Sequence, residues 1–192
     1  MAKGRESGMP GEGYWASFFD PSCVLTALGC DERVRDVVEF GCGYGTFTLP
    51  TARRVFGTVH ALDIDPEMVQ TTARRAADAG LANVRVERRD FVADGCGLPG
   101  AGVDFAMLFN ILHIEDPIAL LREAFRVLRP GGICGIIHWN HDPATPRGPS
   151  MDIRPRPEQC RAWAEEVGFD FDRFEPLDCC PHHYGLVIRR PS

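Results

Sequence analysis

This chain of 192 residues has almost no lysine, because Lys3 is the only one and every other basic residue is arginine. Enzymes that form a Schiff base need a lysine in the folded part of the chain, and so do dehydrogenases that use a Tyr-x-x-x-Lys pair. Position 3 lies in a glycine-rich stretch that we expect to be disordered. The sequence therefore excludes both classes.

The chain also lacks the marks of membrane, secreted and nucleic-acid-binding proteins. No apolar run approaches the roughly 18 residues that span a bilayer, and the amino terminus lacks the charged-then-apolar pattern of a secretory signal. The formal net charge is −6, whereas a nucleic-acid surface needs a basic face. We therefore expect a cytoplasmic protein without a membrane or nucleic-acid partner.

Eight cysteines are present, but none of them forms a C-x-x-C motif. In a large chain without a secretory signal, we expect reduced and mostly buried thiols. The run Cys179-Cys180-Pro-His-His183 resembles a metal-binding segment. Adjacent residues of a strand point to opposite faces, however, so these side chains converge only across a tight turn. We expect no metal site.

The remaining pattern predicts a single α/β domain over residues 13–192, after a disordered segment over residues 1–12. Apolar strand-like runs alternate with helical patterns, which is typical of parallel β-α-β units wound on both faces of a sheet. Two strand-like runs without a helix between them close the chain. The predicted strands cover approximately residues 34–40, 58–63, 83–89, 103–109, 133–138, 171–177 and 184–189.

The stretch from Val37 to Gly45 carries the strongest functional signal. A buried strand ends at Glu39-Phe40 and is followed by glycines at positions 41, 43 and 45. Glycines in that turn let the backbone approach a ligand closely. Asp63, about 20 residues further on, stands where a nucleotide-binding α/β fold holds ribose hydroxyls. These residues predict a cofactor that contains adenosine.

The glycine spacing separates two kinds of cofactor. Dinucleotide-binding loops follow G-x-G-x-x-G, but here the third glycine comes one residue early and position 46 is Thr. The spacing from Glu39 to Gly45 resembles the first motif of class I S-adenosylmethionine-dependent methyltransferases. Further hallmarks of that family stand at Ala61-Leu-Asp-Ile-Asp-Pro-Glu-Met68, Asn110-Ile-Leu-His113 and Arg126-Val-Leu-Arg-Pro-Gly-Gly132. The chain is similar to the small methyltransferases of quinone biosynthesis.

This resemblance implies a Rossmann-like, doubly wound, mostly parallel seven-stranded sheet in the order 3-2-1-4-5-7-6, with an antiparallel last strand. It implies S-adenosylmethionine as the cofactor, with the glycines around the methionine moiety and Asp63 on the ribose. Asp90 would accept from the adenine amino group beside Phe91, and Asn110 would lie near the methionine amino group. The implied cofactor-binding residues are Glu39, Gly41, Cys42, Gly43, Gly45, Asp63, Ile64, Asp90, Phe91 and Asn110.

Methyl transfer to an acceptor that carries a proton needs a base, and histidine suits that role at neutral pH. His113 follows the fourth predicted strand, and His138 and His141 flank the end of the fifth, where we expect both to be exposed. Each could instead make a structural hydrogen bond. Trp139 is a candidate wall of the acceptor site.

The proline-rich connection over residues 145–157 follows the fifth predicted strand, where the family often shapes its acceptor pocket. Arg147 and Arg154 within it could bind an anionic acceptor, although solvated loop charges are the commoner role of such residues. Tyr14, Trp15, Phe18 and Phe19 could form a lid over the cofactor or a docked amphipathic segment.

We therefore predict metal-independent transfer of a methyl group from S-adenosylmethionine to a small molecule, by a monomer or homodimer. The alternatives are a protein that binds S-adenosylmethionine or S-adenosylhomocysteine without catalysis and, less favoured, an NAD-dependent oxidoreductase. The motif Asn110-Ile-Leu-His113 is unlike the corresponding motifs of DNA methyltransferases, which agrees with a small-molecule acceptor.

Overall fold

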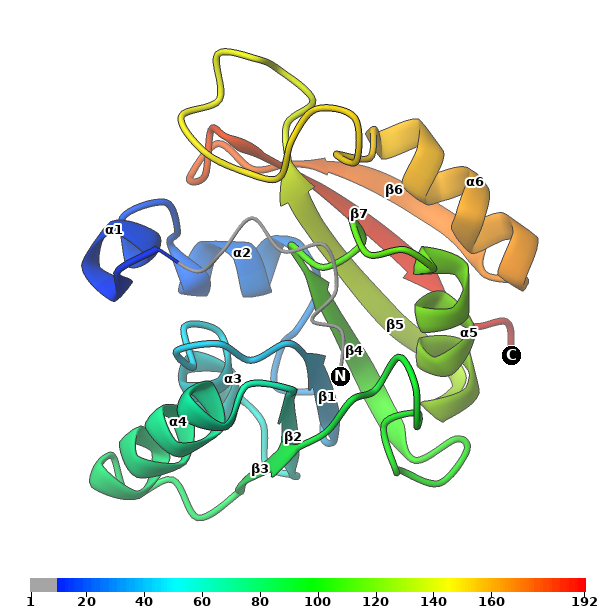
Figure 1. Ribbon diagram of the computed structural model, residues 1–192. Coiled ribbons are helices and arrows are strands. Elements are labelled where there is room, and N and C mark those ends of the chain that lie inside the picture. Colours follow the sequence, from blue (N-terminus) through cyan, green and yellow to red (C-terminus); the bar gives the residue numbers. More distant parts are fainter. Residues whose placement is uncertain (1–9) are drawn as a thin grey trace.

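A computed structural model describes residues 10–192. Helices and strands alternate through most of the chain (Figure 1). In chain order the elements are α1 (Glu12–Ala16), α2 (Pro21–Ala27), β1 (Val37–Phe40), α3 (Thr48–Arg54), β2 (Val59–Asp63), α4 (Pro66–Asp78), β3 (Val84–Arg88), β4 (Val103–Phe109), α5 (Pro117–Val127), β5 (Leu128–Trp139), α6 (Pro157–Val167), β6 (Asp170–Pro176) and β7 (His183–Arg189).

The strands form one seven-stranded sheet in the order β3-β2-β1-β4-β5-β7-β6. The pairs among β1 to β5 are parallel, and β7 runs antiparallel to both β5 and β6. The fold predicted from the sequence is confirmed. Because the strand order reverses between β1 and β4, their carboxyl ends flank a crevice of the kind in which α/β sheets bind ligands.

Helices cover both faces of the sheet, and a separate core lies under each layer. On one face, α5 and α6 pack over a cluster that includes Leu121, Ala124 and Ala164. On the other, α2, α3 and α4 contribute to a cluster that includes Leu25 and Ala76. Figure 1 shows α5 and α6 together on one side, with α3 and α4 on the other. Central strands buried on both faces read as apolar runs, which is why the sequence reveals them clearly.

Three helices begin at the same signal, an aspartate followed by proline. The side chains of Asp20, Asp65 and Asp116 accept hydrogen bonds from the backbone N–H groups of Cys23, Glu67 and Ala119, at 3.0, 2.9 and 2.8 Å. A proline at the first helical position loses no hydrogen bond, because that N–H has no partner within the helix. These caps set where each helix leaves the edge of the sheet.

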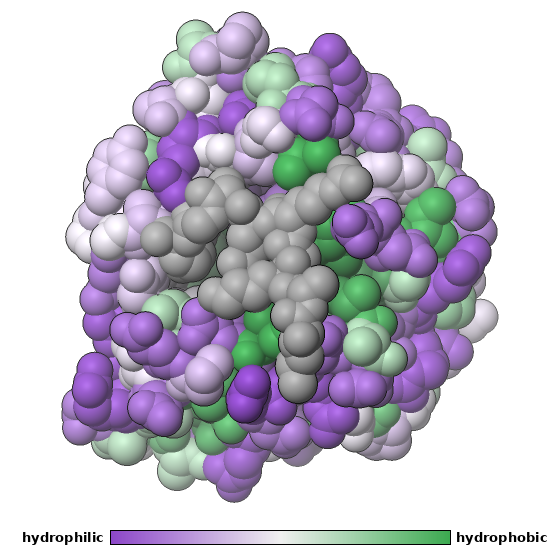
Figure 2. Space-filling model, in the orientation of Figure 1, coloured by the Kyte–Doolittle hydropathy of each residue, from purple (hydrophilic) through white to green (hydrophobic). Residues whose placement is uncertain are grey.

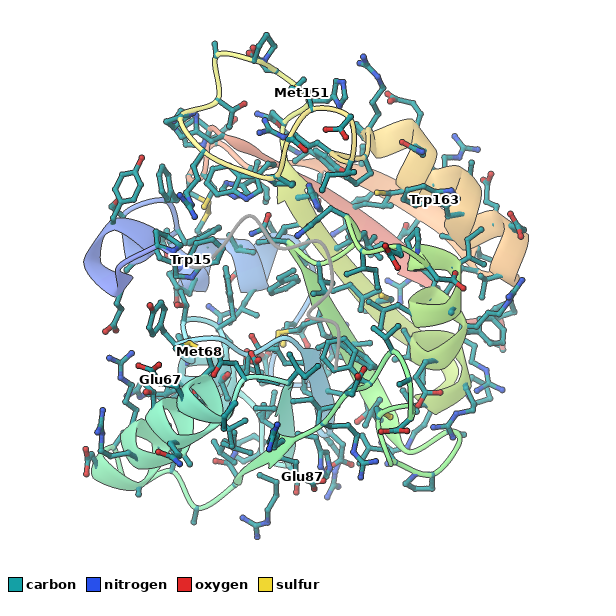
Figure 3. The ribbon with its side chains drawn as sticks, viewed as in Figure 1. Trp15, Glu67, Met68, Glu87, Met151 and Trp163 are labelled. Atoms are coloured by element: carbon teal, nitrogen blue, oxygen red, sulfur yellow. A yellow bond between two sulfur atoms is a disulfide. The ribbon has the colours of Figure 1, made fainter. Side chains whose placement is uncertain are left out.

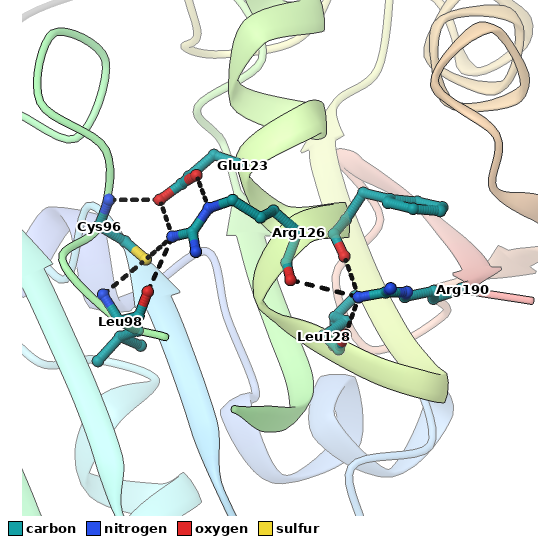
Figure 4. A network of polar contacts seen from close by, with 7 residues as sticks. Cys96, Leu98, Glu123, Arg126, Leu128 and Arg190 are labelled. Atoms are coloured by element: carbon teal, nitrogen blue, oxygen red, sulfur yellow. Dashed lines mark hydrogen bonds and ion pairs between the residues drawn. The ribbon is translucent and has the colours of Figure 1, made fainter. Parts of the chain in front are cut away.

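The fifth strand is longer than its expected range of 133–138, because β5 begins at Leu128. The Arg190 side chain donates from Nη1 to the Leu128 carbonyl oxygen at 2.6 Å, and the Gly131 N–H donates to the Arg190 carbonyl oxygen at 2.9 Å. Figure 4 shows this contact beside the cluster of Arg126, Glu123 and Cys96. Partners distant in sequence extend the strand, so the local pattern could not predict its start.

The expectation that all cysteines are reduced is wrong for one pair. Cys23 in α2 and Cys179 in the turn between β6 and β7 form a disulfide across 156 residues of sequence. Close by, the Asp20 N–H donates to Cys180 Sγ at 3.4 Å. The other six cysteines are free and buried, as expected. The pairing depends on the fold, because only the antiparallel β6-β7 hairpin brings its turn to α2.

The expected disorder over residues 1–12 falls mainly on residues 1–9, which lie outside the described residues. Glu12, within the expected segment, begins α1. Between residues 10 and 192, no helix has the length and apolar character needed to cross a membrane. On the face shown in Figure 2, hydrophilic residues dominate the rim and hydrophobic residues lie nearer the middle.

Candidate active site

A cavity of about 230 Å³ lies at the carboxyl ends of β1, β2, β4 and β5. Trp15 from α1 and Met68 from α4 reach it from different sides, and Figure 3 labels both. It coincides with the crevice at the switch in strand order. Its lining residues are Pro10, Trp15, Glu39, Gly41, Cys42, Gly43, Thr46, Phe47, Asp63, Ile64, Asp65, Met68, Phe91, Phe109, Asn110, Ile111, His113 and Trp139.

The glycine loop holds a conformation that only glycine adopts without strain. Gly41, Gly43 and Gly45 have φ values of 83°, 50° and 78°. The N–H groups of Gly41 and Cys42 both donate to the Leu62 carbonyl oxygen, at 2.8 and 2.9 Å, which fastens the loop to β2. Gly41, Cys42 and Gly43 line the cavity, whereas Gly45 packs against α3 and α4 and shapes the turn from behind.

Asp63, the last residue of β2, connects two loops at the cavity wall. Its Oδ2 accepts from the Gly43 N–H at 2.8 Å, and its Oδ1 accepts from the Asp65 N–H at 2.9 Å. Burial raises the pKa of Asp63, and the two backbone donors oppose that rise. A carboxylate offers about four acceptor positions, so each oxygen retains one for a ligand hydroxyl.

Glu39 is 2% exposed and lies at the cavity floor, at the end of β1. The Thr48 hydroxyl donates to its Oε2. Burial raises the pKa of Glu39 to about 8, and the neighbouring Asp63 charge adds to the rise. A ligand cation at this point would stabilise the ionised carboxylate and oppose that shift.

Asn110 ends β4 in a strained position. Its φ is 55°, one of two positive values at non-glycine residues within the described chain. Both polar atoms of its amide are buried and have no hydrogen-bond partner in residues 10–192. Burying an amide without hydrogen-bond partners lowers the stability of the fold, and a ligand that supplies the missing hydrogen bonds offsets this loss. Asn110 therefore offers the cavity one hydrogen-bond donor group and one acceptor that the described residues do not use.

The residues predicted around the adenine divide into two groups. Ile64 and Phe91 line the cavity, and the Phe91 ring packs edge-on against Phe40 with centroids 5.3 Å apart. Asp90 does not line it, and its Oδ1 accepts from the Ala93 N–H at 3.1 Å. In this structure Asp90 therefore begins a turn.

The three candidate histidines occupy three different environments. His113 is 9% exposed and lines the cavity. The expectation that His138 is exposed is wrong, because β5 places its ring in the core at 0% exposure. His138 Nε2 instead lies 3.2 Å from His113 Nδ1. His141 lies outside the cavity lining, and its Nδ1 is 2.7 Å from the Arg154 carbonyl oxygen.

Burial controls the protonation of the histidine pair. It lowers the pKa of His113 to about 4 and that of His138 well below its usual range. Both rings are therefore neutral at physiological pH, and they can exchange a hydrogen bond without repulsion.

Trp139 lines the cavity as predicted, whereas the two arginines do not. Arg154 is 7% exposed, and its guanidinium donates to backbone carbonyl oxygens, including Pro149 at 2.8 Å and Asn140 at 2.9 Å. The expectation that Arg154 binds an anionic acceptor is corrected by these contacts, which use its donors to brace the connection after β5. The Arg147 carbonyl oxygen accepts one more of them, at 3.4 Å.

The helix α1 lies over the cavity. Trp15 packs near Trp139 with ring centroids 6.4 Å apart, and Pro10 lies beside the glycine loop, where its carbonyl oxygen accepts from the Tyr44 hydroxyl at 3.0 Å. Glu12 forms an ion pair with Arg75. Arg75 also donates to the Tyr44 carbonyl oxygen at 2.9 Å, so one arginine joins α1, α4 and the loop.

The segment with adjacent cysteines and histidines is divided among separate contacts. Cys179 is in the disulfide, and the His183 ring lies against Trp139 at 4.1 Å between centroids. Burial lowers the pKa of His183 to about 3. Among residues 10–192, no three His, Cys, Asp or Glu side chains gather as metal ligands would.

Several residues in or behind the cavity wall had no assigned role in the sequence analysis. Thr72 supports the loop from α4, donating from its hydroxyl to the Gly43 carbonyl oxygen at 2.8 Å. Thr48 does the same for Glu39. Met68 and Ile111 stand inside the quoted motifs, which could have identified them, whereas Phe47 and Phe109 read simply as core residues.

A comparison with protein families matches residues 37–132, half of the chain, to the methyltransferase domain family. The chain belongs to this family. The match runs from the start of β1, through the glycine loop, to the Pro-Gly-Gly segment in β5, so it includes the motifs that form most of the cavity wall. The family uses S-adenosylmethionine as its methyl donor, and membership favours methyl transfer over the nicotinamide alternative.

Curated relatives of this methyltransferase domain include enzymes of small-molecule biosynthesis. Aklanonic acid methyltransferase of Streptomyces sp. (strain C5) is 32% identical over 104 residues, which is 53% of this chain and 45% of that protein. A ubiquinone biosynthesis O-methyltransferase of Parvibaculum lavamentivorans is 33% identical over 106 residues, 54% of this chain and 40% of the relative. The matches thus span less than half of these relatives.

Among solved structures, a SAM-dependent methyltransferase from Aquifex aeolicus superposes with a TM-score of 0.80 and 26% identity, covering 90% of each chain. The apo form of the methyltransferase SibL superposes at 0.74, also with 26% identity, covering 95% of this chain and 57% of that one. The methyltransferase domain therefore shares its sheet and helix arrangement with solved members of the class.

The cavity of this methyltransferase domain has an acidic lining. Its described lining contains the three carboxyl groups of Glu39, Asp63 and Asp65 and no arginine or lysine. S-adenosylmethionine, the methyl donor of the family, carries a sulfonium and an ammonium, both positive, and two ribose hydroxyls. The unpaired amide of Asn110 adds a donor and an acceptor that a methionine moiety can satisfy.

Proposed function

We propose that this chain transfers a methyl group from S-adenosylmethionine to a small, uncharged acceptor. The observation that carries the proposal is the cavity wall around Asp63, where one carboxylate holds Gly43 in place and keeps acceptor positions for ribose hydroxyls. The unpaired Asn110 amide in the same cavity supports it.

The bound donor supplies a methyl group already activated by a positive sulfur. This chain then contributes orientation and exclusion of water, and orientation in favourable cases accounts for about 7–11 kcal/mol of a barrier. Gly41 and Gly43 would let the backbone lie against the methionine moiety, and Phe91 would cover the adenine. Trp15 and Pro10, held over the cavity by α1, would exclude water during transfer.

The acceptor would lie beside Trp139 and His113, at the ends of β5 and β4. Aromatic rings of Trp15, Phe47 and Trp139 line the cavity, and no arginine of residues 10–192 does. These walls favour a flat, uncharged molecule over an anion. The relatives named for aklanonic acid, nocamycin and ubiquinone biosynthesis support a small-molecule acceptor.

His113 is the one candidate histidine that reaches the cavity, so we assign to it the polar contact with the acceptor. Its pKa of about 4 keeps the ring neutral. A group with that pKa is a poor general base for an unactivated hydroxyl at neutral pH. His138 and His141 do not reach the acceptor in this arrangement. Whether the active form is a monomer or a homodimer stays a prediction.

Calorimetric titration with S-adenosylmethionine and S-adenosylhomocysteine tests the proposal. We expect micromolar binding to the wild type, weakened at least tenfold in Asp63→Asn, because the amide replaces one acceptor oxygen by a donor. Asp78→Asn, an exposed change on α4, is the matched control and should bind like the wild type. Absence of binding to the folded wild type would overturn the proposed cofactor.

Turnover separates an enzyme from a protein that binds the cofactor without catalysis. Release of S-adenosylhomocysteine is measured with a panel of flat phenols and amines, each paired with an analogue that carries a carboxylate. We expect turnover with uncharged members of the panel. Binding of the cofactor without turnover on any member of the panel would support the non-catalytic alternative.

A further inference from the structure

His138 is a fully buried polar residue whose ring is not in the cavity. Its Nε2 lies 3.2 Å from His113 Nδ1, and its Nδ1 is buried without a hydrogen-bond partner in residues 10–192. The ring stacks at 28° on Tyr184, with centroids 6.2 Å apart. Phenylalanine would fill such a place without burying a polar nitrogen. Packing alone therefore does not explain a histidine here.

The hydrogens of the pair can be counted. Both rings are neutral and each carries one hydrogen, so one ring must donate across the 3.2 Å contact. If His113 donates, the single hydrogen of His138 lies on Nδ1, which is the buried nitrogen without a partner. If His138 donates from Nε2, only a lone pair remains unpaired at that site.

The second arrangement is the more favourable one. Buried N–H groups without a partner are rare in folded proteins, and an unsatisfied acceptor is tolerated more often. The Trp139 backbone also contacts the His138 ring and raises its pKa, but the contact does not meet the geometry of an ordinary hydrogen bond to Nδ1. No carboxylate is among the hydrogen-bond partners of either ring in the described residues, so the histidine pair itself and the Trp139 backbone are the groups that act on the tautomer.

We propose that His138 is a positioning residue, which holds His113 in the tautomer that carries its hydrogen on Nε2 and so presents an N–H donor to the cavity. His113 Nδ1 is occupied by His138, which leaves Nε2 as the nitrogen available to a ligand. The low pKa values of both rings agree with this neutral arrangement.

This role determines what the acceptor must offer. A ring that donates from Nε2 cannot take a proton there, so His113 does not act as the general base. The acceptor then presents an oxygen lone pair to His113, as a carbonyl or phenol oxygen does. The identity of this ligand rests on the proposed function, whereas the tautomer is a property of the protein without any ligand.

Nuclear magnetic resonance of protein labelled with ¹⁵N-histidine measures the tautomer directly, without knowledge of the acceptor. Long-range proton–nitrogen correlations at neutral pH should show His113 and His138 both protonated on Nε2 and unprotonated on Nδ1. In His138→Phe, His113 should populate both tautomers, because its Nδ1 loses the donor. His60→Gln, in β2 and outside the cavity, is the control and aids assignment.

Two results would overturn the inference: a wild-type His113 protonated on Nδ1, or an unchanged tautomer in folded His138→Phe. If His138→Phe does not fold, His138→Gln serves instead, because its amide can donate from nearly the same place and should retain the Nε2–H form. The wild-type spectrum decides the first point in any case. Titration of the same sample with S-adenosylhomocysteine tests the two proposals separately. A wild type that does not bind this ligand would contradict the proposed cofactor, whereas the tautomer is read from the spectrum without it.

Discussion

At the scale of single residues, the site depends on positions where only one side chain satisfies the local geometry. Gly45 shows this clearly, although it does not line the cavity. A Cβ there would lie 2.6 Å from Leu49 Cδ1 and 3.1 Å from the Thr72 side chain, at a φ of 78°. Thr72 in turn holds the Gly43 carbonyl oxygen, so crowding at Gly45 reaches the ligand-facing part of the loop.

Gly45→Ala should therefore destabilise the protein more than Gly80→Ala does. Both positions have positive φ, and a left-handed alanine costs roughly 1–2 kcal/mol. A Cβ at Gly80 meets nothing within 4 Å, so crowding affects Gly45 alone. We expect Gly45→Ala to lose about 1–3 kcal/mol more in urea unfolding, and to weaken binding of S-adenosylhomocysteine. Equal losses in the two variants would show that the loop accommodates the methyl group.

Glu39 predicts a pH dependence of stability. Its pKa is about 8 in the folded protein, against roughly 4.3 in an unfolded chain. The folded state binds this proton more tightly, so the free energy of unfolding falls as pH rises between the two values. Glu39→Gln has no proton to lose there. The free energy of unfolding of Glu39→Gln minus that of the wild type should therefore increase by roughly 3–4 kcal/mol between about pH 5 and about pH 8.

Urea unfolding at a series of pH values measures that difference. Glu32→Gln, at an exposed position, should follow the wild type throughout. Parallel pH profiles for Glu39→Gln and the wild type would mean that Glu39 ionises in the folded protein as an ordinary carboxyl does.

At the scale of elements, α1 is the shortest helix of the described chain, and it lies over the cavity. It has five residues and none of them is buried. Its ties are the ion pair between Glu12 and Arg75, the bond from Tyr44 to Pro10, and the ring contacts of Trp15. Arg75 lies on α4 and Tyr44 lies in the glycine loop. Release of α1 from these two residues would therefore open the cavity on the side of α4 and the loop.

Glu12→Gln should speed the release of S-adenosylhomocysteine. A partly exposed ion pair contributes about 0.2–1 kcal/mol, so the dissociation rate should rise by up to about fivefold. Stopped-flow tryptophan fluorescence measures this rate, since Trp15 and Trp139 both line the cavity. Added salt should raise the wild-type rate and leave Glu12→Gln nearly unchanged. Equal dissociation rates in the two proteins at low salt would show that this ion pair does not hold α1 over the cavity.

At the scale of the whole molecule, the disulfide joins the two ends of the described chain. Cys23 lies in α2 and Cys179 in the turn between β6 and β7. The rings of His182 and His183, after that turn, contact Phe18 and Phe19. Such a bond closes a long loop and restricts the unfolded chain, an effect commonly worth about 2–5 kcal/mol.

Reduction should therefore lower the melting temperature by on the order of 10 °C. The Cys23→Ser variant should melt near the reduced wild type and should not respond to a reductant. The five buried thiols outside the cavity lining provide an internal check, because they should react with a thiol reagent only on unfolding. A wild type whose melting temperature does not change with reductant would show that the bond is absent or without effect on stability.

Sequence patterns predicted the sheet and most of the cavity because these depend on local signals. The local signals are the apolar runs of the strands, the Asp-Pro helix starts and the glycines at 41, 43 and 45, each of which acts within a few residues. The parallel strands then bring Glu39, Asp63 and Asn110 to one edge of the sheet. Once such strands pair, their carboxyl ends have to meet there. The family, the fold and the cofactor class followed from the sequence by itself.

The tertiary structure decided how the remaining candidates are used. Whether His138 is exposed, whether Arg154 faces a ligand and whether Cys23 meets Cys179 all depend on contacts between segments far apart in the chain. Burial and hydrogen-bond partners are properties of the packed molecule, and the order of residues along one strand or loop does not contain them. The sequence therefore determined which chemical groups stand at the sheet edge, and packing determined which of them line the cavity.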